Sequence, residues 1–547
     1  MNNSNKMNEN ITDNKITKNK DLLKPANFEE AIDSAGFGLF NCILILITIL
    51  CSTANIFSST AISYILPIAE CDLKLTLLNK GALNAVTYAG MITSAIVWGY
   101  LADTQGRKKI LVIGCLADAI SSACCSLSQN FQMLIVFKFI EGFAANGPCA
   151  VLFTYLTEFH NAKNRPRLSM ILGLIQSFAS LILPMLAWLI LPQDWDFITQ
   201  SSFKVHTWQI FLFICGLPSL LSGIIFLVLP ESPKFLMSQG RNTEALNVFQ
   251  QIYAVNRRQS KDLYPIRQLI EEVPSRDSIH IPSAIFTVEG KSSKLNKSRK
   301  TTSFKQSLHD GWLQMRPMFH KPLLSRSLHV YLMLFALLLG LNSIRLWLPQ
   351  LFASISKYEA LHTDASDSTD LCTIVEFSVN KTQDVQSYTS DCSAYKNISM
   401  DMYLNNIIVA VIGLLGYFCA MFIIRVLGPK RLANYSLFVA ALFGIGLYWS
   451  TDSLATLIIS ALFVNISSIA TASLNGLILT LFPTTLRTSV ASLSMMFGRL
   501  GSLSGNLLFP IFMEYGCLPP FLMVSSMTIF ASILSCLLPK ETDLLFL

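Results

Sequence analysis

Two arginines lie inside long apolar stretches of the sequence, where a charged side chain is costly. Arg345 belongs to the stretch 328–354, which contains no acidic residue, and Arg499 belongs to the stretch 488–513. An ionisable group at that depth in a membrane marks a substrate or ion pathway by default. The two guanidinium groups together would favour an anionic or zwitterionic solute. Arg345 has an alternative interpretation, because it is within three turns of the end of its stretch and could extend its charge to the lipid headgroups.

Three further ionisable residues occupy two neighbouring apolar stretches. Asp118 precedes the polar connection near Ser128, and Lys138 and Glu141 follow it at similar distances, so the three side chains could meet at one depth. Two hypotheses stay open for them: a buried network that ties two helices together, and a proton or substrate site. Trp347 is a further candidate, as an aromatic wall of a substrate cavity.

A short charged loop, WGYLADTQGRKKIL at 98–111, interrupts the apolar sequence. Asp103 ends one apolar stretch, and Arg107 follows about one turn later, with Gly106 between them. The Asp103 carboxylate could accept hydrogen bonds from the first backbone amides of the next helix and from Arg107. The pattern therefore predicts a gate. The alternative, an anchor of positive charge, needs neither the acid nor the glycine at a fixed offset.

The same kind of loop recurs along the chain, which indicates an internal repeat. In TEFHNAKNR, Glu158 stands seven residues before Arg165, and in TLFPTTLR, Thr480 stands seven residues before Arg487. A second echo, IRVLGPKR, repeats the glycine and basic residues of the first loop but lacks its acid. We expect a gate that includes Glu158, Arg165 and Arg487 and depends more on the first half of the chain.

The elements that position these residues are apolar runs long enough to cross a bilayer. Hydrophobic residues make up 52% of the chain and charged residues 14%, which is far from a soluble domain. Runs of about 20 apolar residues suit helices that span a hydrocarbon core about 30 Å thick. We predict an all-α membrane protein of twelve transmembrane helices, near 38–67, 81–101, 110–127, 132–157, 169–191, 208–230, 328–354, 402–424, 432–450, 453–482, 488–513 and 518–538.

Basic residues fix the expected orientation. With both termini cytoplasmic, 32 of the 41 Lys and Arg residues lie on the cytoplasmic side, six lie on the opposite side and three lie within spans. The positive charge is thus a topology signal, and we expect no binding of nucleic acid. The predicted parts are a tail at 1–36, a six-helix half at 37–230, a linker at 231–327, a second six-helix half at 328–538 with an extracytoplasmic loop at 355–401, and a short tail at 539–547. Within the linker, the spacing of Ala245, Val248, Phe249 and Ile252 predicts one amphipathic helix on the membrane face.

The loop 355–401 has the features of an extracellular or lumenal segment. It contains glycosylation sequons at Asn380 and Asn397 and two cysteines, Cys372 and Cys392. On the non-cytoplasmic side of a membrane, these residues predict a glycosylated loop closed by a Cys372–Cys392 disulfide.

The motifs resemble those of the major facilitator superfamily. The loop at 99–108 fits the pattern G-x-L-x-D-x-x-G-R-K, and PESPK at 230–234 fits a second signature. Within the superfamily, the chain is most similar to the synaptic vesicle glycoprotein 2 family and related organic ion transporters, through YLTEFH at 155–160, HTWQIF at 206–211 and LWLPQ at 346–350.

The resemblance implies two six-helix halves that alternate access to a central cavity, with the loop at 99–108 clamping them on the cytoplasmic side. It implies that Lys138, in place of the usual Arg of an R-x-x-x-G element, faces the cavity, and that Arg499 holds a position where similar organic anion carriers also have a cation. Vesicle proteins of the family have acids in the first span, but this chain has Asn55 there, which argues against proton coupling through that helix.

Together these observations predict a secondary transporter of a small organic anion or zwitterion, working as a monomer in the plasma membrane or in a vesicle. We find no pattern for an enzyme, a cofactor or a metal site. The alternative is a non-transporting membrane protein that binds a protein partner through the loop 355–401.

Overall fold

The computed structural model describes residues 25–161, 165–193, 195, 197–198, 204–270, 323–361, 370–384, 400–482 and 487–538. Long helices dominate these residues, as expected. The first half contains α3 (Leu39–Ala69), α4 (Leu77–Gln105), α5 (Arg107–Ser126), α6 (Phe131–Glu158), α7 (Arg165–Ile190) and α8 (Thr207–Val228). The second half contains α12 (Leu323–Leu361), α15 (Asp401–Leu427), α16 (Pro429–Gly446), α17 (Ser453–Leu481), α18 (Arg487–Glu514) and α19 (Leu518–Cys536).

Eleven helices in the described part of the chain are long and apolar enough to cross a membrane. The remaining long helix, α18, is less apolar because it carries Arg499 and several serines, and it packs between α12 and α4. Side-chain caps begin two of the helices: Thr76 accepts a hydrogen bond at the start of α4, and Asn130 does so at the start of α6. Prolines inside α6 and α8 are tolerated because neighbouring helices surround them.

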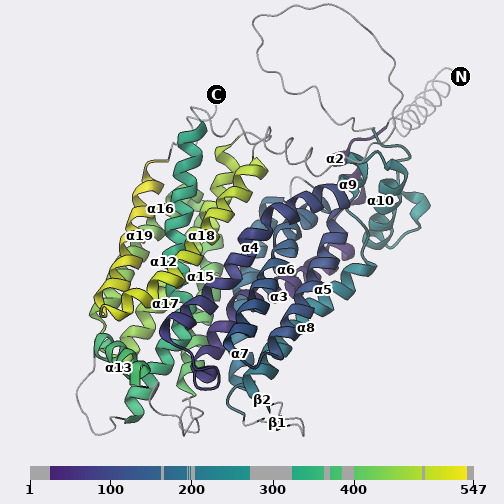
Figure 1. Ribbon diagram of the computed structural model, residues 1–547. Coiled ribbons are helices and arrows are strands. Elements are labelled where there is room, and N and C mark those ends of the chain that lie inside the picture. Colours follow the sequence, from purple (N-terminus) through teal and green to yellow (C-terminus); the bar gives the residue numbers. More distant parts are fainter. Residues whose placement is uncertain are drawn as a thin grey trace, which may run out of the picture.

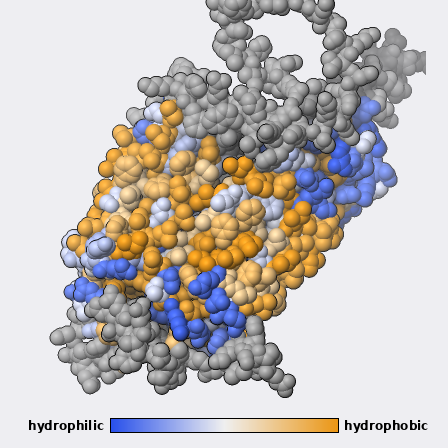
Figure 2. All heavy atoms as spheres, in the orientation of Figure 1, coloured by the Kyte–Doolittle hydropathy of each residue, from blue (hydrophilic) through white to orange (hydrophobic). Residues whose placement is uncertain are grey.

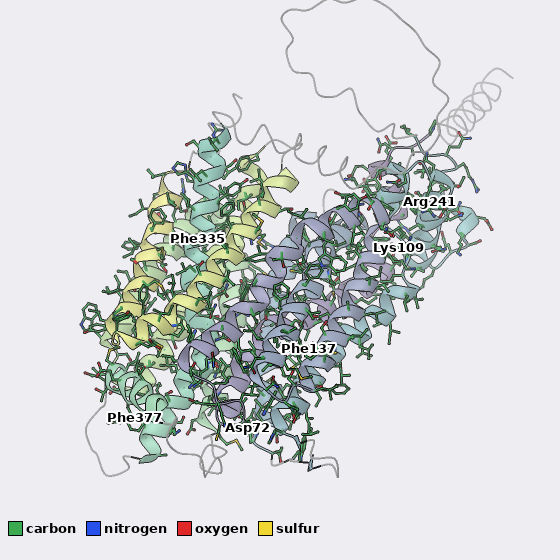
Figure 3. The ribbon with its side chains drawn as sticks, viewed as in Figure 1. Asp72, Lys109, Phe137, Arg241, Phe335 and Phe377 are labelled. Atoms are coloured by element: carbon green, nitrogen blue, oxygen red, sulfur yellow. A yellow bond between two sulfur atoms is a disulfide. The ribbon has the colours of Figure 1, made fainter. Side chains whose placement is uncertain are left out.

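The short elements mark the two ends of the bundle (Figure 1). At one end, which we call the linker end, lie α2 (Phe28–Ala35), α9 (Pro233–Ser238), α10 (Asn242–Arg257) and the 3-10 helix η1 (Lys261–Leu263). At the opposite end, the loop end, lie α13 (Leu371–Asp384), the 3-10 helix η3 (Leu447–Trp449) and an antiparallel hairpin of β1 (Phe197–Ile198) and β2 (Lys204–Val205). Figure 3 shows Lys109 and Arg241 at the linker end and Asp72 and Phe377 at the loop end.

In the described part of the chain, the halves contact each other most extensively through three helix pairs, α4 with α18, α7 with α15 and α3 with α12. Within the first half, α4 approaches α6 closely at Gly142. A Cβ atom there would lie 2.8 Å from the carbonyl carbon of Thr87, so a larger residue would force the two helices apart. Small residues at such crossings are typical of membrane helices, which associate by close packing.

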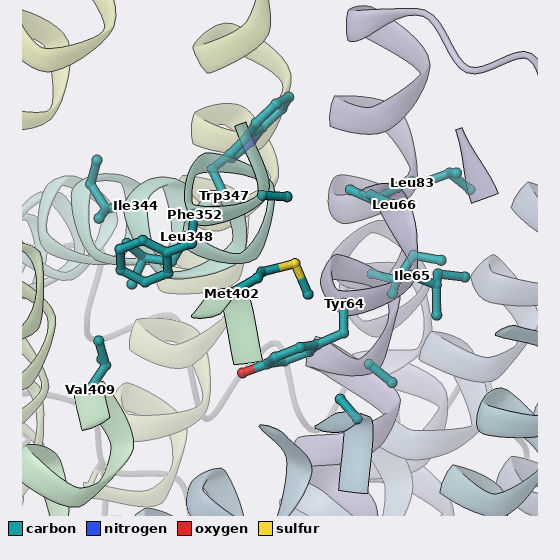
Figure 4. Packing of buried hydrophobic residues seen from close by; sticks show 14 of the residues in the cluster. Tyr64, Ile65, Leu66, Leu83, Ile344, Trp347, Leu348, Phe352, Met402 and Val409 are labelled. Carbon is teal, nitrogen blue, oxygen red and sulfur yellow. The ribbon is translucent and has the colours of Figure 1, made fainter. Parts of the chain in front are cut away.

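Within the described residues, the halves share a large hydrophobic cluster at the loop end and a small one that packs Tyr88 of α4 against Leu346 of α12. One cluster at the loop end contains buried residues of both halves, among them Ile65 of α3 and Phe352 of α12 (Figure 4). At the linker end, the first half has its own cluster around Tyr155, and the second half has a separate cluster around Leu334. The bundle is therefore closed at the loop end, and its halves separate toward the linker end.

The visible surface is apolar between two hydrophilic ends (Figure 2). Exposed large apolar side chains lie on helices of both halves, for example Val228 of α8 and Val426 of α15, with exposed fractions of 87% and 83%. In water such a surface would cause aggregation, and in a bilayer it is the lipid-facing belt.

The predicted amphipathic helix in the linker is confirmed as α10, but its apolar face does not lie on the membrane. Phe249 is buried against Phe28 of α2, with ring centroids 6.0 Å apart. Tyr264 closes the other side of this small core, where its hydroxyl donates to the carbonyl of Ala31 at 2.7 Å. Burial raises the pKa of the Tyr264 phenol. The segment before α3 is thus fastened to the linker.

Candidate functional site

A cavity of about 130 Å³ lies between the two halves, bounded by α3, α7, α12, α15 and α17. We call it the central cavity. Figure 4 shows Tyr64, Leu348 and Val409 from three of these helices close to one another. Its polar wall residues are Thr60, Ser63, Tyr64, Gln176, Ser177, Ser180, Arg345, Asn406, Tyr417, Asn465 and Ser468.

Arg345 is the charged residue in the described wall of the central cavity. Its guanidinium donates to the hydroxyl of Ser180 at 3.3 Å, across the boundary between α12 and α7. No carboxylate in the described part of the chain forms an ion pair with Arg345 or lines the cavity. Arg345 therefore lies in the cavity wall, and its hydrogen-bond partner among the described residues is the neutral hydroxyl of Ser180.

Two asparagines also line the central cavity. The side-chain amide of Asn465 donates to the carbonyl of Val409 at 2.9 Å, and that of Asn406 donates to the carbonyl of Met402 at 2.7 Å. Each side-chain amide is thus oriented by the backbone, and its second N–H group and its oxygen can bind further polar groups.

Arg499 lies outside the wall of the central cavity. Its guanidinium donates to Asn146 Oδ1 and to Cys149 Sγ, the latter at 3.6 Å. Both partners belong to α6 of the first half, whereas Arg499 belongs to α18 of the second half. Asn146 in turn donates to Ser94 Oγ of α4 at 3.1 Å. The second predicted cation is therefore part of a polar contact between the halves.

Lys138 and Glu141 form a buried ion pair in the first half, with Lys138 Nζ 2.8 Å from Glu141 Oε2 and side-chain exposures of 1% and 3%. The thiol of Cys125 donates to the same carboxylate at 3.2 Å. Asp118 is also buried and accepts from the hydroxyls of Ser58 and Ser219. None of these residues lines the central cavity, so the geometry fits the network hypothesis better than a substrate site.

Two weaker candidates also lie away from the cavity wall. Asn55 is partly buried on α3 but does not line the central cavity. Trp347 is 3% exposed, and its ring packs beside Phe509 with centroids 5.4 Å apart. Trp347 faces a different pocket at the loop end.

The predicted helix cap at the linker end is made by a different acid. Asp103 is exposed, and within the described residues its carboxylate accepts no hydrogen bond. Glu231 Oε1 instead accepts from the backbone N–H groups of Arg107 and Lys108, at 2.9 and 3.0 Å, and from that of Ser232 at 3.0 Å. A carboxylate at the first turn of α5 satisfies amides that have no partner within the helix. The prediction that Asp103 caps α5 is wrong, because the Glu231 carboxylate accepts from these amides instead.

Arg107 connects this cap to α6 and α9. Its Nε atom lies 3.4 Å from Glu158 Oε2, and its guanidinium carbon lies 4.9 Å from the ring centre of Phe235. The Ser232 hydroxyl donates to the same Glu158 carboxylate. We call Arg107, Glu158, Glu231, Ser232 and Phe235 the linker-end cluster.

Gly106 is required beside the linker-end cluster for two reasons. Its φ is +101°, a left-handed conformation that favours glycine. A Cβ atom at this position would also lie 2.9 Å from the carboxyl carbon of Glu231. Arg165 and Arg487, the other predicted gate residues, begin α7 and α18, and their side chains lie outside the described residues.

A model of the Major Facilitator Superfamily matches residues 48–367, more than half of the chain. The chain belongs to the Major Facilitator Superfamily. Solved structures of this superfamily have the same fold. The partially occluded inward open xylose transporter from E. coli aligns over 92% of this chain and 100% of its own, with a TM-score of 0.61 and 14% identity. A D-xylose–proton symporter aligns over 92% and 98%, with a TM-score of 0.60 and 16% identity.

Curated relatives of this superfamily member include synaptic vesicle glycoproteins. It is 30% identical to synaptic vesicle glycoprotein 2B of Rattus norvegicus over 42% of this chain and 34% of that protein. It is 25% identical to synaptic vesicle glycoprotein 2C of Mus musculus over 66% of this chain and 49% of that protein. The matched regions thus span about a third to a half of these relatives.

The superfamily motifs contained a signal for Glu231 that the sequence analysis did not use. Glu231 is the acid of the PESPK signature, and the structure places it on the loop at 99–108, which is the other signature. Two motifs 124 residues apart therefore form one contact. The acid in PESPK and the basic residues of the loop at 99–108 have opposite charges, which was the signal for this contact.

The disulfide prediction is corrected at the loop end of this superfamily member. Cys372 of α13 is bonded to Cys517, with Cα atoms 5.2 Å apart, and not to Cys392. The bond joins α13 to the start of α19, because α13 packs on the bundle instead of forming a separate loop. Cys392 and Asn397 lie outside the described residues, and Asn380 belongs to α13.

Proposed function

We propose that this protein carries a small organic anion across a membrane by alternating access, with Arg345 as the charge that binds the solute. The observation that supports this proposal is the Arg345 guanidinium in the central cavity, which lacks an acidic partner among the described wall residues. An unpaired charge held in a low-dielectric site is unfavourable, so an anion that enters gains both the attraction and the hydrogen bonds.

The neutral wall narrows the class of solute. Asn406 and Asn465 supply neutral amide groups, which can donate to and accept from polar groups on the solute. A zwitterion would have to place its ammonium among such neutral acceptors. We therefore place organic monoanions with hydrogen-bond donors ahead of zwitterions, and zwitterions ahead of cations.

At the linker end the two halves have separate hydrophobic cores, which indicates the state of the transport cycle. The basic residues indicate that this end is cytoplasmic. The loop end is then closed to the outside, and the halves are apart on the cytoplasmic side, which corresponds to an inward-facing state. In this state Asp103 is exposed, as expected for a latch residue whose partner half has moved away. The linker-end cluster keeps α5, α6 and α9 together, so that the first half moves as one body.

Uptake into proteoliposomes tests the proposal. Purified protein should take up members of a panel of small carboxylates in a saturable manner, zwitterionic amino acids less, and quaternary ammonium cations not at all. Protein-free liposomes are the control. Saturable uptake of the cations but not of the carboxylates would refute the role of Arg345, and uptake of no solute would favour a non-transporting protein that acts through the loop 355–401.

A further inference from the structure

The wall of the central cavity contains hydroxyl groups whose hydrogen-bond partners can be assigned one by one. A hydroxyl has a single hydrogen to donate, so a hydroxyl that already donates to the protein has none left for a solute. Among the seven hydroxyls in the described wall, five donate to backbone carbonyls: those of Thr60, Ser63, Ser180, Tyr417 and Ser468. The hydroxyls of Tyr64 and Ser177 remain.

Tyr64 is the more informative of these two residues. A serine in a helix can turn its hydroxyl to a carbonyl of the preceding turn, so Ser177 can pair without a solute. The Tyr64 hydroxyl lies at the tip of a rigid ring and cannot do so. In the described part of the chain it forms no hydrogen bond, and its oxygen stays accessible although Tyr64 as a whole is only 9% exposed. Figure 4 shows the side chain extending away from α3 on the side of Met402 and Val409, and Val409 is another wall residue.

Arg345 provides unused donors in the same wall. Its guanidinium is close enough to Tyr64 to interact with the phenol electrostatically. Ser180 accepts from Arg345, while the hydrogen of Ser180 goes to the carbonyl of Gln176 at 2.9 Å, so the remaining N–H groups of Arg345 are available to a solute. An anion in the cavity would thus meet donors from both halves, Tyr64 of α3 and Arg345 of α12. A carboxylate has two oxygens and can accept from both donors at once.

We propose that Tyr64 is a second solute-binding residue and that, with Arg345, it holds the carboxylate of a short aliphatic monocarboxylate. This inference rests on the proposed function. One carboxylate oxygen accepts from the Arg345 guanidinium, and the other accepts from the Tyr64 hydroxyl. The aliphatic body then lies against the apolar part of the wall, which includes Leu183, Leu348 and Val464. The cavity volume of about 130 Å³, at roughly 10–15 Å³ for each water, is space for about ten waters and suits a short chain.

The same two donors select against amino acids. Norvaline differs from pentanoate by an ammonium group beside the carboxylate, and this ammonium would lie next to the Arg345 guanidinium. Like charges at such a distance repel each other, more strongly in a cavity than in bulk water. We therefore expect the KM of norvaline to exceed that of pentanoate by a factor of about ten or more.

Uptake of pentanoate into proteoliposomes by Tyr64→Phe tests the inference. A lost hydrogen bond to a charged group should raise KM about tenfold with little change in the maximal rate. The thermal midpoint should stay unchanged, because the hydroxyl bonds to nothing in the described protein. Tyr417→Phe should raise KM less, since the Tyr417 hydroxyl already donates to the carbonyl of Ser468 at 3.0 Å. The matched control is Tyr88→Phe, which changes a tyrosine that is 8% exposed and lies outside the cavity wall, and it should leave KM unchanged.

The outcomes distinguish this inference from the proposed function. A KM that rises in Arg345→Gln but not in Tyr64→Phe would overturn the role of Tyr64 and leave the proposed function standing. A lower thermal midpoint in Tyr64→Phe would also overturn it, because the hydroxyl would then be bonded within the protein. If no carboxylate is taken up, the proposed function fails, and isothermal titration of the purified protein with pentanoate decides on Tyr64. Binding that weakens about tenfold in Tyr64→Phe would support its role, and absent or unchanged binding would overturn it.

Discussion

Replacing Glu231 by Ala removes the carboxylate that accepts the first two backbone amides of α5 and the amide of Ser232. A hydrogen bond to a charged group contributes about 1.5–3 kcal/mol, and these three are only partly buried. Two helix-start amides would be left to water, so we expect the free energy of unfolding to fall by about 2–4 kcal/mol. Glu231→Gln keeps an acceptor of about half the strength and should cost about 1–2 kcal/mol.

Thermal unfolding in detergent, followed with a dye that reacts with buried thiols as they become exposed, measures this effect. Cys115 of α5 is 2% exposed, so it reports on the helix that loses its cap. The matched control is Asp103→Asn, which changes an exposed acid beside the same loop. We expect the midpoint to fall most in Glu231→Ala, less in Glu231→Gln and little in Asp103→Asn. A larger loss in Asp103→Asn than in Glu231→Ala would refute the assignment of the cap.

Three further predictions concern the charged residues. Lys138→Met leaves the buried Glu141 carboxylate unpaired and should lower the free energy of unfolding by about 3–5 kcal/mol. Adding Glu141→Leu should restore most of this loss, which thermal unfolding of the single and double variants measures. Arg499→Ala breaks the contact with Asn146 and should lower the maximal uptake rate several-fold without changing KM, since Arg499 lies outside the central cavity; a higher KM alone would contradict this. In a variant with a cysteine introduced into the cavity wall at Ser468, Asp103→Ala should increase thiol labelling from the cytoplasmic side, and unchanged labelling would make Asp103 a membrane anchor.

The fold could be predicted from the sequence because the bilayer imposes one length on every spanning helix. Apolar runs of about 20 residues have few alternatives in a membrane, so the long helices lie close to the predicted ranges. The distances along the chain from the polar connection near Ser128 also predicted Lys138 and Glu141 at similar depth, and the structure pairs these two side chains.

The direction in which each helix turns its side chains could not be predicted. A helix that is apolar on all sides gives no periodic signal for its buried face, so both Arg345 and Arg499 were candidates for the cavity. The structure turns Arg345 toward the central cavity and Arg499 toward α6. The cap by Glu231 and the Cys372–Cys517 bond were missed for another reason, because each joins residues more than 120 positions apart.

The central claim is that one guanidinium in the cavity binds the solute, and uptake by Arg345→Gln tests it most directly. Arg425→Gln is the matched control, because it removes an arginine that is exposed at the linker end of α15. A charge-assisted hydrogen bond is worth about 1.5–3 kcal/mol, which is a factor of about 10 to 150 in affinity. For the carboxylate transported best, we predict that KM rises at least tenfold in Arg345→Gln and stays unchanged in Arg425→Gln. Equal KM values in Arg345→Gln and the unmodified protein would contradict the account.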